Sequence, residues 1–159
     1  MANDILIRTM QLQHVIDMNK KFVQSMHDDY VYFPTSYKSY LIRKHSLPQL
    51  IRSILSPKSC ILLAYNTQSS LRGYCVMRLE RSEPSTLLWI YVDQSARGSG
   101  IGKILVRAAL ERAKDYGSPG MQLLTHDRDD FFAQQGFERT HRISGMLAGV
   151  DMSIMKAVL

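Results

Sequence analysis

The chain has 159 residues, 45% of them hydrophobic, and a formal net charge of +6 at pH 7. This length and apolar content suit one compact domain over residues 1–159, and no repeat or low-complexity tract appears. No apolar run approaches about twenty residues and residues 1–4 do not begin a signal peptide, so we expect a cytoplasmic protein without a membrane segment. The positive charge favours anionic partners, but the basic residues are scattered, so nucleic-acid binding is only a minor alternative.

The first part of the chain predicts one strand and two helices. Alternation predicts a strand over residues 4–8, and helical spacing predicts a helix over 12–28. Residues 30–40 hold four tyrosines and a proline without clean periodicity, so we expect a loop or a broken helix. This segment is either a substrate-side wall or a loop packed on its own aromatic rings. A capping serine predicts a further helix over 46–55.

Three strands are expected in the middle of the chain, over residues 60–65, 72–79 and 86–92. A polar turn joins the first two into an antiparallel hairpin. Cys60 and Cys75 fall in these apolar runs, so we expect buried thiols in a reducing compartment rather than a disulfide framework.

A glycine-rich turn joins the strand 86–92 to a helix that apolar spacing predicts from Ile101 and that Gly117 ends. The start of a helix offers N–H groups without partners and partial positive charge, which together suit an anion. Three glycines in the turn permit close approach of a phosphate, and two basic residues add charge at its rim. The residues predicted to bind a phosphate-bearing cofactor are Arg97, Gly98, Ser99, Gly100, Ile101, Gly102 and Lys103.

Two common nucleotide motifs do not fit this turn. In a dinucleotide fingerprint that begins at Gly98, Lys103 occupies the place of the third glycine. In a P-loop, Ile104 occupies the place of the serine or threonine that follows the lysine. The turn is therefore either a phosphate-binding loop of another class or an ordinary flexible turn with three glycines, and the strand before it and the helix after it favour the first.

The last part of the chain predicts a strand over residues 121–125, a short helix over 127–135 and a final hairpin. We expect the hairpin to reverse at Ser144 and Gly145. The whole pattern of elements is that of a mixed α/β domain.

The run Arg97–Gly102 resembles the acetyl-CoA pyrophosphate loop of the GNAT superfamily of N-acetyltransferases, Q/R-x-x-G-x-G/A. Residues 71–77, 131–137 and 151–156 are similar to three further segments of that family, in the same order. The likeness covers about the last ninety residues. It implies a mixed, mostly antiparallel central sheet of six to seven strands flanked by about four helices.

The resemblance also implies acetyl-CoA as cosubstrate and direct transfer of its acetyl group to a primary amine. In similar proteins the strand before the loop splays from its neighbour, carries the pantetheine arm and offers a main-chain N–H to the thioester. Ile90, Tyr91 and Val92 occupy that place. The usual tyrosine acid of the family is replaced by Phe132, and the preceding asparagine by Thr125.

Direct transfer requires an amine in its free-base form and benefits from a proton donor for the leaving thiolate. Tyr91, Tyr116 and His126 are alternative donors, and spacing does not choose among them. His126 is also a candidate base because histidine accepts a proton near neutral pH, although a surface or capping role is the simpler interpretation. Glu80 is a weaker candidate base. The candidate catalytic residues are His126, Tyr91 and Glu80.

No second histidine or cysteine stands at ligand spacing from His126, so no metal site is expected. Asp127, Asp129 and Asp130 either attract a cationic substrate or stabilise the start of a helix. The acceptor stays open between a small polyamine-like or antibiotic amine, a protein amine, and an aminoacyl-tRNA of the kind that toxin-like relatives use. A non-catalytic acyl-CoA-binding module is the alternative function. Nine methionines and many aromatic residues cover a dimer face or fill the core.

Overall fold

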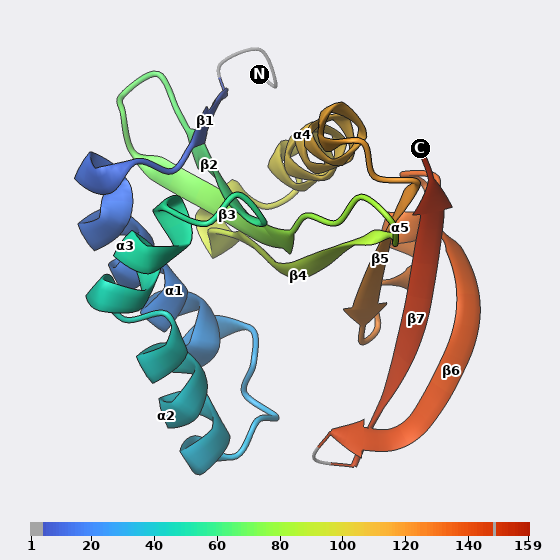
Figure 1. The fold of residues 1–159 in the computed structure, drawn as a ribbon. Coiled ribbons are helices and arrows are strands. Elements are labelled where there is room, and N and C mark those ends of the chain that lie inside the picture. Colours follow the sequence, from blue (N-terminus) through green and yellow to red (C-terminus); the bar gives the residue numbers. More distant parts are fainter. Residues whose placement is uncertain (1–4, 148) are drawn as a thin grey trace.

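A seven-stranded sheet forms the centre of the protein (Figure 1). The structure, a computed structural model, describes residues 5–147 and 149–159. The strand order is β1-β2-β3-β4-β5-β7-β6, and among the described strand pairs only β4 and β5 run parallel. The strands are β1 (Leu6–Thr9), β2 (Ser59–Tyr65), β3 (Leu71–Arg78), β4 (Ser85–Val92), β5 (Gly120–Thr125), β6 (Glu138–Leu147) and β7 (Val150–Val158).

The described residues form five α-helices around this sheet. Helices α1, α2 and α3 lie on one face, and α4 lies on the other (Figure 1). Short 3-10 turns precede α1 and follow β4. The helices are α1 (Val15–Asp28), α2 (Thr35–Lys44), α3 (Leu47–Ile54), α4 (Ile101–Tyr116) and α5 (Asp129–Ala133).

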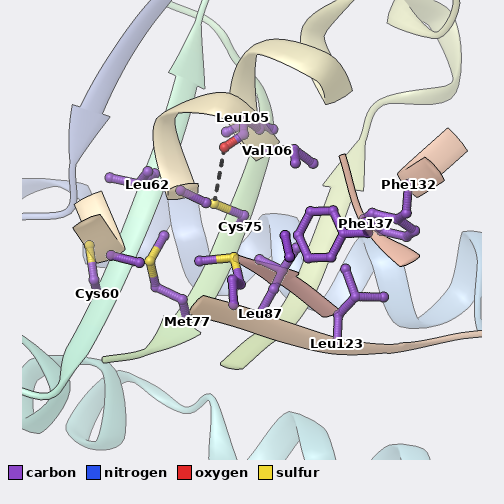
Figure 2. Close-up of a cluster of buried hydrophobic side chains, with 14 of the residues drawn as sticks. Cys60, Leu62, Cys75, Met77, Leu87, Leu105, Val106, Leu123, Phe132 and Phe137 are labelled. Carbon is purple, nitrogen blue, oxygen red and sulfur yellow. Dashed lines mark hydrogen bonds between the residues drawn. The ribbon is translucent and has the colours of Figure 1, made fainter. Parts of the chain in front are cut away.

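Each face of the sheet carries its own hydrophobic core. The core under α4 gathers Cys75, Leu105 and Phe137 among others (Figure 2). The core under α1 includes Phe22, Tyr74 and the indole of Trp89. Because side chains alternate along a strand, β4 contributes to both cores: Ile90 and Val92 pack toward α4, whereas Trp89 and Tyr91 pack toward α1.

Most of the predicted elements are confirmed, including the mixed and mostly antiparallel sheet. Cys60 and Cys75 are both buried and free. Asp4, the expected first residue of the first strand, lies outside the described residues. Within the described part of the chain, no helix combines the length and the apolar character that a membrane span requires.

Residues 30–40 combine the two expected alternatives, because residues 30–34 are irregular and α2 begins at Thr35. Tyr37 and Leu41 stand four residues apart and so share one helix face. Leu41 is buried in the core under α1, and Tyr37 packs against it. The expected segment stopped at Tyr40, whereas the helix continues to Lys44.

The expected turn at Ser144 and Gly145 is wrong, because β6 continues to Leu147 before the chain reverses. Gly145 has a φ of +63° and lies where the register of β6 against β7 shifts. This glycine therefore makes a bulge within the strand rather than the hairpin turn.

Candidate active site

The sheet opens between β4 and β5. The two strands pair only from Ser85 to Leu87 and from Met121 to Leu123. Beyond Leu87, β4 continues to Val92 without pairing to β5. The splay that the family resemblance implies is therefore present.

A bulge in β4 marks the start of this opening. In the pairing of β4 with β3, Met77 lies opposite Leu87 but Val76 lies opposite Trp89, so Leu88 is an extra residue. A bulge of this kind bends the strand and increases its twist. Leu88 thus lies where β4 turns away from β5, a feature that the sequence does not signal.

Main-chain groups of β4 face the opening. The N–H of Asp93 donates to the carbonyl of Arg72 at 2.8 Å, toward β3. Because N–H directions alternate along a strand, those of Ile90 and Val92 point to the opposite side, toward β5. The carbonyl of Val92 also points away from β3, since it accepts from Nε of Arg97 at 3.1 Å. Ile90 and Val92 can therefore offer backbone donors to a ligand in the opening.

The glycine-rich turn lies at the end of β4 and leads into α4. Gly100 is the N-cap of α4 with a φ of +86°, and no side chain of the described residues caps this helix end. The first helical bond runs from the N–H of Ile104 to the carbonyl of Gly100 at 3.1 Å. The N–H groups of the first helical turn thus remain available to an anion. Lys103 is exposed beside them.

A local hydrogen bond and two packed side chains hold the turn in shape. The hydroxyl of Ser99 donates to the carbonyl of Ala96 at 2.6 Å. A Cβ on Gly102 would approach the Phe131 ring to 3.3 Å, so this glycine lets α5 pack closely on the start of α4. Ile101 is buried beneath the turn, which fixes its position against the core.

Arg97 is held in place by three neighbours. Its guanidinium pairs with Asp29 at 2.5 Å, its Nε binds the carbonyl of Val92, and it lies 5.9 Å from the centre of the Tyr91 ring. Asp29 follows the last residue of α1. The side chain at the rim of the turn is therefore already joined to the helix on the opposite face of the sheet.

Two further contacts join α1 to this end of β4. Lys21 pairs with Asp93 at 2.7 Å, and both side chains are mostly buried. The hydroxyl of Tyr91 donates to Asp28 at 2.8 Å. Burial, and then this hydrogen bond, raise the pKa of Tyr91 above its ordinary value, so the phenol stays protonated. Together these contacts fix the end of α1 and the aromatic segment that follows it.

Replacing Asp93 with alanine should lower the free energy of unfolding by about 1–3 kcal/mol, because the poorly solvated Lys21 ammonium loses its carboxylate partner. Glu80→Ala is the matched control, since the Glu80–Lys58 pair is more exposed and should contribute clearly less to stability. Urea denaturation measures both changes. Equal losses in the two variants would contradict the stabilising role of the Lys21–Asp93 pair.

His126 lies just beyond the last residue of β5. Its Nδ1 is 3.0 Å from the carbonyl of Asp151, and its Nε2 is 2.8 Å from the carboxylate of Asp127. A carbonyl and a carboxylate only accept, so in this arrangement each ring nitrogen donates a hydrogen, and Nε2 becomes an acceptor only when Asp127 moves away. The ring meets Tyr32 edge-on at 5.3 Å between centres. Tyr32 comes from the segment between α1 and α2, and sequence reasoning did not single it out.

The other candidate catalytic residues lie apart from His126. Glu80 lies near the start of β4, at the opposite end from the glycine turn, and pairs with Lys58 at 2.8 Å and Arg78 at 3.7 Å. Tyr116 ends α4, far from its N-terminus, and lies beside Arg81. The ring of Tyr91 is buried against α1. The structure thus brings neither Glu80 nor Tyr116 to the glycine turn.

Phe132 and Thr125, which replace two polar residues of the family pattern, are both buried. Phe132 packs between Phe131 and Phe137 in the core under α4 (Figure 2). Its ring cannot donate a proton. Phe132 therefore contributes to the packing of the core under α4 rather than to proton transfer.

Four aspartates surround a depression of about 290 Å³ at α5, β6 and β7. Asp129 accepts from Ser153 at 2.7 Å and pairs with Arg139 at 3.2 Å. Asp151 pairs with Arg142. Asp129 and Asp151 are therefore committed to neighbours on the same part of the fold. Among the described residues, no three His, Cys, Asp or Glu side chains are grouped as metal ligands.

Comparison with known proteins gives a family and a fold. The family model described as "Acetyltransferase (GNAT) domain" matches residues 57–139, which is more than half of the chain. No curated protein matches the sequence. Solved structures match nearly the whole chain.

Three of these structures illustrate the fold. PaiA N-acetyltransferase from Thermoplasma acidophilum, solved in complex with coenzyme A, has a TM-score of 0.80 at 21% identity, covering 98% of this chain and 99% of that one. Ard1 from Thermoplasma volcanium has a TM-score of 0.74 at 16% identity, covering 98% of each chain. A GNAT-family acetyltransferase from Streptococcus pneumoniae has a TM-score of 0.74 at 15% identity, covering 98% of this chain and 100% of that one.

Proposed function

Because the chain belongs to the GNAT acetyltransferase family, and is thus an acyltransferase, we propose that it transfers the acetyl group of acetyl-CoA directly to a primary amine. The observation that carries this proposal is the opening between β4 and β5, which ends at the glycine turn and the uncapped start of α4. Backbone donors for a thioester on β4 are thus followed along the chain by backbone donors for a pyrophosphate at the start of α4. The complex of the similar PaiA structure with coenzyme A gives further support.

The residues of β4 and of the glycine turn fit the cosubstrate. Residues 97–103 would hold the pyrophosphate through the free N–H groups of the α4 start and the charge of Lys103. Ile90, Tyr91 and Val92 would line the pantetheine arm, with the N–H of Ile90 or Val92 polarising the thioester carbonyl. The thioester supplies the activated acetyl group.

His126 is the proposed general base of the transfer. Its Nε2 accepts a proton from the amine as the amine nitrogen forms a bond to the thioester carbon, and the carbon–sulfur bond then breaks. The hydrogen bond from Nδ1 to the carbonyl of Asp151 keeps a hydrogen on Nδ1, so Nε2 can accept once its contact with the Asp127 carboxylate is released. Asp127 is 80% exposed and can move aside for the amine. The thiolate takes its proton from water, since Phe132 cannot supply one.

The test is isothermal titration with acetyl-CoA and with CoA, followed by measurement of thiol release with a panel of amines in the same preparation. We expect binding of both cofactors and amine-dependent thiol release. Binding without release would favour the non-catalytic module, and no binding would overturn the cofactor assignment.

A further inference from the structure

Two exposed leucines lie on either side of the opening between β4 and β5. Leu88 is 47% exposed and Leu124 is 41% exposed. Leu87 packs toward α4, and the bulge therefore leaves both Leu88 and Trp89 on the face toward α1. Leu124 alternates with Leu123, which also packs toward α4, so Leu124 shares the face of Leu88. The rim of the opening on the α1 side is thus apolar.

Aromatic rings from the segment between α1 and α2 reach both strands at this rim. Tyr30 meets Trp89 of β4 edge-on at 5.3 Å, and Tyr32 meets His126 beyond β5 at 5.3 Å. Phe33 contacts both tyrosines, at 5.1 Å and 4.8 Å. The segment therefore forms an aromatic wall that extends from β4 to the proposed base. We call the two leucines, Tyr30, Tyr32 and Trp89 the apolar rim.

Two of the carboxylates next to the apolar rim are already paired, and a third, Asp127, contacts the proposed base His126. Asp28 accepts from the hydroxyl of Tyr91, and Asp29 pairs with Arg97. Burial raises the pKa of both Tyr30 and Tyr32 above the ordinary value, so their hydroxyls remain neutral. A substrate with several positive charges would find these two carboxylates occupied. A substrate with an apolar group beside its amine would cover Leu88, Leu124 and the aromatic rings.

We infer that the acceptor is a small primary amine attached to an aryl or alkyl group, which the apolar rim binds. This inference rests on the proposed acetyl transfer and names its substrate class. Apolar surroundings disfavour the charged ammonium relative to the neutral amine, which is the form that attacks the thioester. The rim would thus both select the acceptor and assist a single histidine base.

The test compares 2-phenylethylamine with spermidine as acceptors for the wild type and for Leu124→Glu. We expect 2-phenylethylamine to have at least a tenfold higher kcat/KM than spermidine, and Leu124→Glu to lower its kcat/KM about tenfold. Leu55→Glu is the control, because Leu55 is 80% exposed at the end of α3 and should leave both substrates unaffected. Preference for spermidine, or equal use of the two amines, would overturn the inference and leave the transferase proposal intact.

A binding readout separates this inference from the proposed activity. Trp89 belongs to the rim and is the only tryptophan of the chain. In the presence of CoA, binding of 2-phenylethylamine should change the fluorescence of Trp89 in the wild type and not in Leu124→Glu. A change without thiol release would overturn the transfer and support the rim as an amine site. No fluorescence change in the wild type would overturn the inference whatever the activity.

Discussion

Valine in place of Gly100 should weaken CoA binding at least about 100-fold, which corresponds to about 2.7 kcal/mol. Gly100 has a φ of +86°, in the left-handed region that a β-branched residue adopts only with strain. Its position as N-cap also brings it next to the free N–H groups of α4, where the pyrophosphate would approach closely. The substitution would therefore either displace these donors or block the phosphate.

Gly117→Val provides the matched control for this loss. Gly117 caps the other end of the same helix with a φ of +89°, so valine there should strain the backbone by a similar amount. We expect both variants to lower the melting temperature and only Gly100→Val to lose affinity for CoA. Isothermal titration and thermal unfolding measure the two effects. Similar loss of affinity in both variants would mean that folding, rather than the phosphate cradle, explains the result.

The phosphate cradle could be predicted from the sequence because its signal is local. A buried strand, three glycines and an amphipathic helix follow one another within about thirty residues, from residue 86 to Tyr116. The mixed α/β class followed from the pattern of elements, the mostly antiparallel sheet was implied by the family resemblance, and the strand order was not predicted. The open choice at residues 30–40 and the error at Gly145 arose because the same residue types suit two kinds of structure. Tyrosines suit a helix face as well as a loop, and a glycine suits a bulge as well as a turn.

The rest of the site depends on contacts between distant parts of the chain. The pairs that join α1 to the glycine turn are separated by 72, 63 and 68 residues, for Lys21–Asp93, Asp28–Tyr91 and Asp29–Arg97 respectively. The bulge at Leu88 is defined by the pairing of β4 with β3, and the opening is defined by the short pairing of β4 with β5. No local pattern in one sequence encodes such pairings, which is why Arg97 was interpreted as a rim charge and Tyr32 was not singled out.

Replacing His126 with alanine should lower kcat by about 100-fold near neutral pH, because general base catalysis typically contributes at least that factor. The affinity for CoA should not change, since His126 lies beyond β5 and the glycine turn follows β4. Steady-state kinetics with thiol detection, together with titration of CoA, separates the two quantities. His27→Ala is the control, because His27 is exposed in the last turn of α1.

Two results distinguish a base from a residue that only shapes the site. Added imidazole should restore part of the activity of His126→Ala, because it can occupy the space left by the ring and accept the proton there. The fall in rate toward acid pH that protonation of the base causes should also disappear from the pH–rate profile of the variant. A variant with an unchanged profile, or without rescue by imidazole, would show that His126 positions Tyr32 or Asp127 and that the amine loses its proton to solvent. In that case the apolar rim would be the main means by which the protein supplies a neutral amine.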